Sequence, residues 1–108
     1  MPPLEPRDHT ITLADAIQHT RRHRAANTGR AEDGMNAGAF SAGQVRDLLA
    51  QQGCSALRIY HGRGAKGERT MVLVGVDATG QDMTQGMLME VCYPCPPWCA
   101  TNSPLLTG

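Results

Sequence analysis

The chain has 108 residues, of which 41% are hydrophobic and only 4% are aromatic. This length suits one domain, and this apolar content excludes wholesale disorder. Ten basic and ten acidic residues give a net charge of zero, which removes any global electrostatic case for binding nucleic acid or an anionic membrane. The predicted core consists of Val, Leu, Ile and Met, and a partner chain, a metal or a disulfide would strengthen such a thin core.

The N-terminal residues 1–10 contain three prolines and are expected to form an extended arm. They include no apolar segment of the kind that signal peptides carry, and no run in the chain approaches the length that crosses a membrane. We therefore expect a cytoplasmic protein with reduced thiols.

A first helix is predicted to begin after Thr12. Thr12 and Asp15 have the spacing of a capping box, in which two side chains satisfy the free N–H groups at a helix start. This helix is expected to run toward Asn27. Residues 27–39 then show no periodicity and hold three glycines, which predicts a mobile loop.

A second helix has the best local signature in the chain. Ser41 and Gln44 repeat the capping-box spacing, and Phe40 and Val45 occupy the two positions of a hydrophobic staple. Gly53 is the expected left-handed residue at which this helix stops.

Strand patterns follow the second helix. Residues 56–61 alternate between apolar and polar, and residues 70–76 are apolar on both faces, as in a central strand. Residues 87–92 predict a third strand, with a short helix over 83–91 as the alternative. Two helices followed by a small antiparallel sheet of about three strands and an irregular Cys/Pro-rich tail indicate an α+β fold.

The domain boundaries follow from these elements. We expect the extended arm over 1–10, a single α+β domain over 11–99 and a flexible C-terminal end over 100–108.

Five sequence blocks resemble those of a known family. They are Ile-Thr-Leu-Ala-Asp-Ala-Ile at 11–17, a helix end Gln-Gln-Gly-Cys at 51–54, Leu-Arg-Ile-Tyr-His-Gly at 57–62, Val-Leu-Val-Gly-Val-Asp at 72–77 and Cys-Pro-Pro-Trp-Cys at 95–99. In this order they resemble a family of small bacterial proteins, common in Bacteroidetes-type genomes, whose tails read Cys-Pro-Pro-Tyr-Cys. The resemblance covers residues 11–99. It implies a self-standing single domain and transfers neither an activity nor a catalytic residue.

The cysteine tail is the region where chemistry could lie. Cys92, Cys95 and Cys99 have the spacing C-x2-C-x3-C, and three such ligands could hold zinc with Cys54 or His61 as the fourth. The prolines at 94, 96 and 97 count against a metal, because they remove backbone N–H groups that support cysteine ligands.

Sulfur chemistry offers two other interpretations of the tail. Cys92 and Cys95 form a C-x-x-C pair, which is typical of thiol-redox proteins. Alternatively, Cys95 and Cys99 could form a structural disulfide, which needs their Cα atoms within about 7 Å. An extended Pro-Pro segment would hold them farther apart, so this disulfide requires a turn, for which a cis proline would serve.

The aromatic residues of the tail favour a binding role. Tyr93, Pro96, Pro97 and Trp98 together form a stiff aromatic segment that suits a partner anchor. Our leading hypothesis is a non-enzymatic protein-binding or self-assembling module, either a homo-oligomer or bound to a protein partner, with a thiol-redox protein as the rival. A self-association surface is also predicted from the methionines at 71, 83, 87 and 89.

Two further motifs have plainer interpretations. His19 and His23 have the spacing of a chelating pair on a helix, but beside three arginines they predict a solvated face. The glycine-rich segment 62–67 lacks the Gly-Lys-Ser/Thr ending of a phosphate-binding loop and lies between two predicted strands. It therefore predicts a hairpin turn. No Ser/His/Asp arrangement or carboxylate pair indicates an enzyme.

Overall fold

The computed structural model describes residues 3–27 and 35–108. Helices and small antiparallel sheets confirm the α+β class. Contacts within the chain define two compact units. We call them the sheet unit, which contains residues up to Pro6 and Phe40–Cys92, and the tail unit, which contains Arg7–Ala39 and Tyr93–Gly108. The boundaries expected from sequence remain predictions.

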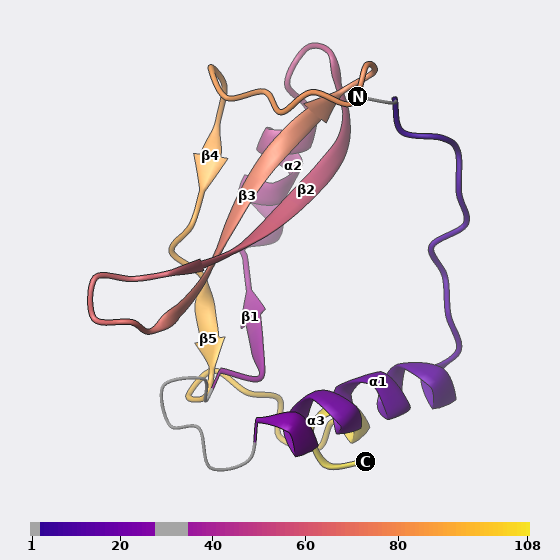
Figure 1. The fold of residues 1–108 in the computed structure, drawn as a ribbon, viewed down its shortest axis with the longest axis vertical. Helices are drawn as coiled ribbons and strands as arrows, with labels where there is room; N and C mark the ends of the chain where they lie inside the picture. Colours follow the sequence, from indigo (N-terminus) through magenta and orange to yellow (C-terminus); the bar gives the residue numbers. More distant parts are fainter. Residues whose placement is uncertain (1–2, 28–34) are drawn as a thin grey trace. The chain divides into compact units, whose positions relative to one another are not determined.

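The sheet unit combines one helix with a three-stranded antiparallel sheet in the order β2-β3-β4 (Figure 1). Its elements are α2 (Ala42–Leu49), β2 (Cys54–Arg63), β3 (Arg69–Asp77) and β4 (Leu88–Met89). β2 and β3 form a long hairpin whose pairing extends to Arg63 and Arg69. The helix α2 contacts β2 and β3.

The core of the sheet unit lies where α2 meets the sheet. Leu48, Leu73 and Met89 form its buried cluster, and the hydrophobic residues packed against it are Phe40, Val45, Leu57, Met71 and Met87. The predicted staple residues thus both reach the core. Of the four methionines predicted to form a self-association surface, Met89 is buried in this cluster and Met71 and Met87 are half-buried against it. Self-association itself stays a prediction.

The second helix ends as predicted, because Gly53 has the expected positive φ of 85°. Two other predictions fail. The predicted capping box does not form, because the Ser41 side chain makes no capping hydrogen bond. The third strand is shorter than predicted. At its start the Met87 N–H donates to the Gln51 Oε1 at 2.7 Å in place of a strand partner, while Gln51 Nε2 donates to the Leu48 carbonyl at 2.8 Å.

A polar cluster fixes the turn after β3. The Asp77 carboxylate accepts hydrogen bonds from the N–H groups of Thr79 at 2.9 Å and of Gln81 at 3.1 Å. The chain then brings Asp82 back to β2, where it pairs with Arg58 at 2.6 Å and accepts a hydrogen bond from the Tyr60 hydroxyl. The bonds from Tyr60 and Arg58 hold the pKa of the Asp82 carboxyl below its usual range.

The tail unit joins segments from both halves of the chain. Its elements are α1 (Leu13–Ala26), β1 (Ala37–Ala39), β5 (Tyr93–Cys95) and α3 (Pro104–Thr107). The Thr12 side chain accepts a hydrogen bond from the Asp15 N–H at 3.1 Å, which confirms the predicted helix start. The strand β1 is antiparallel to β5, with Ala37 opposite Cys95.

Two elements of the tail unit were not expected. The strand β1 lies in the segment predicted as a loop, whose residues 28–34 lie outside the described part of the chain. Its Ala-Gly-Ala sequence has no strand period, and the ladder with β5 supplies its hydrogen bonds. The helix α3 lies in the end predicted to be flexible. There the Ser103 side chain accepts a hydrogen bond from the Leu105 N–H at 3.2 Å and Pro104 occupies the first turn.

Arginines join α1 to α3. Arg24 donates to the Leu105 carbonyl at 2.6 Å and to the Gly108 oxygen at 2.7 Å, and Arg21 donates to the same Gly108 oxygen at 3.0 Å. No residue of α1 is buried. The pairing of these two helices therefore depends mainly on charged donors at the carbonyl end of α3, where cations are favourable.

Within the described residues, 3–27 and 35–108, no helix combines the length and apolarity needed to cross a membrane.

Candidate functional site

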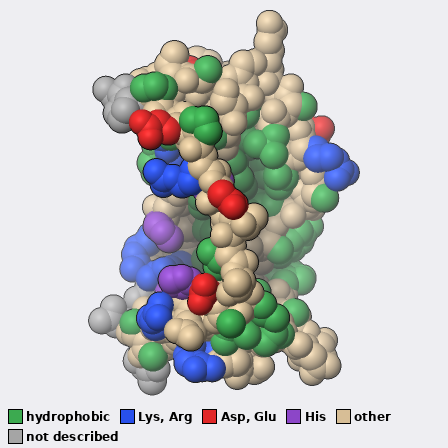
Figure 2. Space-filling view, turned by 90° about the vertical axis from the view of Figure 1, so that its right-hand side faces the viewer, with side chains coloured by type: hydrophobic (Ala, Val, Ile, Leu, Met, Phe, Trp, Pro, Cys, Tyr) green, Lys and Arg blue, Asp and Glu red, His purple; other side chains and the backbone are tan. Residues whose placement is uncertain are grey.

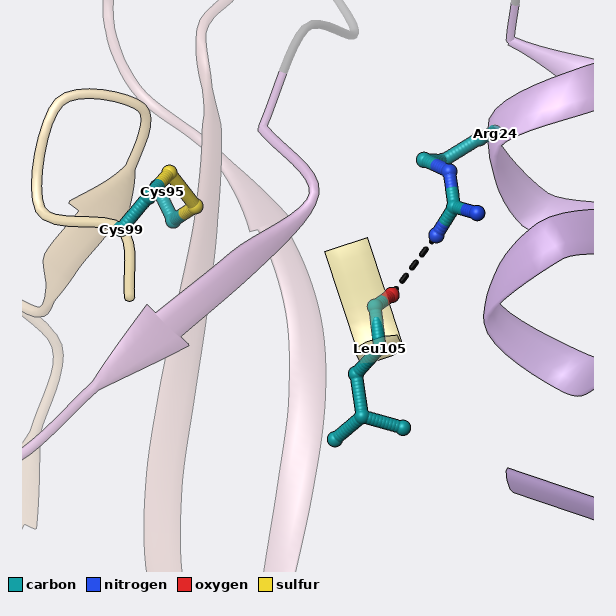
Figure 3. Close-up of a disulfide and its surroundings, with 4 residues drawn as sticks. All are labelled: Arg24, Cys95, Cys99 and Leu105. Carbon is teal, nitrogen blue, oxygen red and sulfur yellow. Dashed lines mark hydrogen bonds between the residues drawn. A yellow bond between two sulfur atoms is a disulfide. The ribbon is translucent and has the colours of Figure 1, made fainter. Parts of the chain in front are cut away.

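The cysteine tail forms a loop closed by a disulfide. The short strand β5 carries Cys95 to the start of the loop, and the Asn36 N–H donates to the Cys95 carbonyl at 2.7 Å. Cys95 is joined to Cys99, four positions later, with their Cα atoms 4.8 Å apart (Figure 3). Of the pairings left open by the sequence, the structure contains this one.

Backbone hydrogen bonds order the chain inside the loop. The Trp98 N–H donates to the Pro94 carbonyl at 2.9 Å, and the Cys99 N–H donates to the Pro97 carbonyl at 2.9 Å. The peptide bonds before Pro96 and Pro97 are both cis. The loop is thus the turn that a Cys95–Cys99 disulfide requires. We call residues 93–99 the aromatic loop.

Two aromatic rings lie together on this loop. The Tyr93 and Trp98 ring centroids are 5.6 Å apart and the rings are tilted by 59°, which is within the range of favourable aromatic pairs. Trp98 is 60% exposed and Tyr93 is 47% exposed. The predicted partner-binding residues are therefore brought together, and two large rings remain accessible to a partner.

The four cysteines differ in state and exposure. Cys95 is buried and Cys99 is exposed within their disulfide. Cys92 and Cys54 are free thiols and are half-buried. Cys54 is the first residue of β2, and its thiol donates to the Ala56 carbonyl at 3.4 Å.

The predicted zinc ligands do not fit a metal site in this structure. The sulfurs of Cys95 and Cys99 are bonded to each other, so neither is a thiolate that could bind zinc. Cys54 and His61 lie at different positions along β2. Across residues 3–27 and 35–108 there is no group of three or more His, Cys, Asp or Glu side chains that could hold a metal ion.

The histidines of α1 line a small hollow of about 160 Å³ together with Arg24 and Leu105. His23 is half-buried, and its Nε2 lies 3.0 Å from the Asn27 Nδ2. His19 is exposed, with its Nδ1 3.3 Å from Arg22. The predicted solvated face therefore holds for His19 and only in part for His23.

The sheet unit also has an apolar groove, of about 440 Å³, between α2 and β4. Val91 at its border is 89% exposed and Leu88 is 55% exposed. Figure 2 draws the right-hand side of Figure 1, and hydrophobic side chains also reach the surface of that face. Met87 and Met89, two of the methionines predicted to form a self-association surface, line this groove. The exposure of Leu88 and Val91 was not expected, because a regular strand over residues 87–92 would turn alternate residues inward.

No protein-family model, curated protein or solved structure matches this chain. A function for this chain is therefore inferred from the geometry of the aromatic loop.

Proposed function

We propose that the chain is a non-enzymatic protein-binding or self-assembling module whose contact surface is the aromatic loop. The observation that supports this most is the exposure of Trp98, 60%, on a loop closed by the Cys95–Cys99 disulfide. Trp and Tyr are the residue types that contribute most to binding energy at interfaces. A loop that is ordered before binding loses less conformational entropy on association, which favours affinity.

Fluorescence can report on this loop alone, because Trp98 is the only tryptophan of the chain. If the chain self-assembles through the aromatic loop, the Trp98 emission shifts to shorter wavelength as protein concentration rises, and acrylamide quenching falls. Light scattering on the same samples gives the oligomeric state. If a different protein is the partner, both changes appear only when that partner is added.

A matched pair of variants tests whether the loop carries the contact. Trp98→Ala removes the exposed ring, while Ile11→Ala removes an equally exposed apolar side chain, 60% accessible, from the same unit. We expect association to weaken at least tenfold in Trp98→Ala, as for a residue at the centre of an interface, and to stay unchanged in Ile11→Ala. A wild-type chain that stays monomeric and retains no protein from lysate would remove the support for this function.

The redox state of the loop provides a second test. Disulfides persist in oxidising compartments and are reduced in the cytoplasm. In the expected cytoplasmic location the aromatic loop would therefore be reduced and open, whereas in the structure its disulfide is closed. If closure orders Trp98 for binding, reduction of Cys95–Cys99 weakens association. Equal association before and after reduction would mean that closure is not needed.

A thiol-redox function is the second candidate, and the exposure of Cys99 favours it. An external thiolate could attack the Cys99 sulfur, form a mixed disulfide with it and release Cys95 as the thiolate that receives the electron pair. Titration of the thiols of the reduced protein at several pH values tests this. A redox role requires a cysteine with a depressed pKa, so ordinary values for all four thiols would rule it out.

A further inference from the structure

The apolar groove between α2 and β4 has two different walls. One wall consists of Phe40, Gln44 and Asp47, and the other is the continuous segment 87–91. Gln44 and Asp47 lie three residues apart and share one side of α2, and Phe40 precedes this helix. All the lining residues belong to the sheet unit, so the groove is a feature of that unit alone.

The strand β4 is an edge of its sheet. It pairs with β3, where Leu73 lies opposite Met89 and Val74 lies opposite Leu88, and among the described residues no strand lies on its other side (Figure 1). An edge strand presents unpaired backbone N–H and C=O groups on its outer side. An extended peptide can add to such an edge as a further strand, with backbone hydrogen bonds that give affinity and side-chain contacts that give specificity.

The two faces of the segment 87–91 differ in chemistry. Met89 belongs to the buried cluster beneath α2, and Met87 packs against that cluster. Leu88 and Glu90 alternate with them, so they project from the opposite face, and both are exposed. A strand added beside β4 would therefore place one row of its side chains against the two methionines and Phe40, and the other row beside Leu88 and Glu90. Methionine side chains adapt to the shape of an apolar partner.

The charged groups of the groove are carboxylates. Asp47 lies on the α2 wall and Glu90 on the β4 wall, both exposed, and no Lys, Arg or His is among the described residues that line the groove. No salt bridge or side-chain hydrogen bond joins either carboxylate to another of residues 3–27 and 35–108. The groove therefore combines an apolar floor with negative charge on both walls, which complements a basic partner.

We propose that this groove binds an extended segment of another protein, which adds to β4 as a fourth strand and alternates apolar with basic side chains. The apolar row covers Met87, Met89 and Phe40, and the positive charges meet Glu90 and Asp47. Pairing with β4 of a second copy would instead bring like charges together. The groove and the aromatic loop belong to different units, so either proposal can fail alone.

An octapeptide that alternates valine and lysine tests this proposal when it is titrated into the full chain and followed by amide NMR. We expect saturable shifts at residues 87–91 and on α2. An octapeptide that alternates valine and glutamate keeps the apolar row and reverses the charge, and we expect no saturable shift with it. Methylation of every peptide nitrogen of the valine–lysine octapeptide removes the N–H donors of the added strand, and we expect binding at least about tenfold weaker.

Variants of the chain test the charged contacts. Glu90→Gln and Asp47→Asn should each weaken binding of the valine–lysine octapeptide about two- to fivefold, as expected for an ion pair accessible to water. Glu5→Gln is the matched control, since it removes the same charge from an exposed site in the same unit, and it should leave the affinity unchanged. Trp98→Ala should also leave it unchanged, which separates this groove from the aromatic loop.

Three results would overturn the proposal: no saturable shift at 87–91, equal binding of the valine–glutamate octapeptide, or shifts at 87–91 that appear when the chain alone is concentrated. The last result would make a second copy the occupant of the groove. An unchanged affinity of the methylated octapeptide would contradict the addition of a strand to β4. These comparisons use the wild-type chain, so they decide the matter even if a variant fails to fold.

Discussion

In the sheet unit Leu48, Leu73 and Met89 share a buried cluster beneath α2, whereas in the tail unit α1 buries none of its side chains. Of the buried hydrophobic residues of the described chain, only Cys95 belongs to the tail unit. The tail unit instead contains the disulfide and the arginine contacts between α1 and α3. One small chain thus uses apolar burial in one unit and covalent and charged contacts in the other.

The largest expected effect comes from the core of the sheet unit. Leu48→Ala empties a position that is 0% exposed, and we expect it to lower the free energy of unfolding by about 2–5 kcal/mol. Denaturant unfolding followed by circular dichroism measures this. Leu13→Ala is the control, since Leu13 is 59% exposed, and a cost similar to that of Leu48→Ala would mean that burial does not distinguish the two units.

The second largest effect is expected in the tail unit when its disulfide is opened. Opening the Cys95–Cys99 bond, four positions apart, removes a loop-closure contribution of about 2 kcal/mol. We expect reduction, or a Cys95→Ser/Cys99→Ser double variant, to speed hydrogen exchange at the amides of Trp98 and Cys99. Exchange in β3 should not change, and faster exchange there would show that the two units are not stabilised separately.

The arginine contacts are expected to have a smaller effect. Arg24→Ala removes the donors to Leu105 and Gly108, and for such half-buried charged hydrogen bonds we expect a loss of about 1 kcal/mol and fraying of α3. The amide shifts of residues 104–108 report this directly. Arg22→Ala, which removes an exposed charge from the same helix, should leave α3 intact.

The smallest effect is expected from Asp82, because ion pairs accessible to water contribute little. Its folded pKa is lowered by Tyr60 and Arg58, so this stabilisation is lost as the pH falls through that pKa. The hydrogen bond to Asp82 raises the pKa of Tyr60, so its stabilisation is lost as the pH rises through the raised value.

The stability difference between wild type and Asp82→Asn should therefore be full between about pH 4 and 10 and decline on both sides. Urea unfolding across this range measures it. A difference that does not vary with pH would show that the Asp82 contacts are not electrostatic.

The sequence predicted local features well and distant pairings poorly. Thr12 and Gly53 were assigned correctly, because a helix start and a left-handed stop depend on neighbours in the chain. The strand β1 could not be predicted, since Ala37–Ala39 becomes a strand only through pairing with Tyr93–Cys95. The start of β4 at Leu88 depends on a similar distant contact, because the Gln51 side chain accepts the hydrogen bond of the Met87 N–H.

The candidate site was predicted in part. Proline and cysteine spacing marked the tail as a stiff segment and left its pairing open, and Tyr93 and Trp98 lie together as a partner anchor would require.

The pairing of β1 with β5 has a consequence for synthesis of the protein. The sheet unit is built mostly from the continuous segment Phe40–Cys92, whereas the tail unit joins residues that lie before it to residues that follow it. On the ribosome, Phe40–Cys92 can begin to fold while Ala37–Ala39 still lacks its partner strand. The β1–β5 ladder, and with it the aromatic loop, can therefore form only after β5 emerges, so the order of translation places the proposed contact surface after α2 and the β2–β3 hairpin.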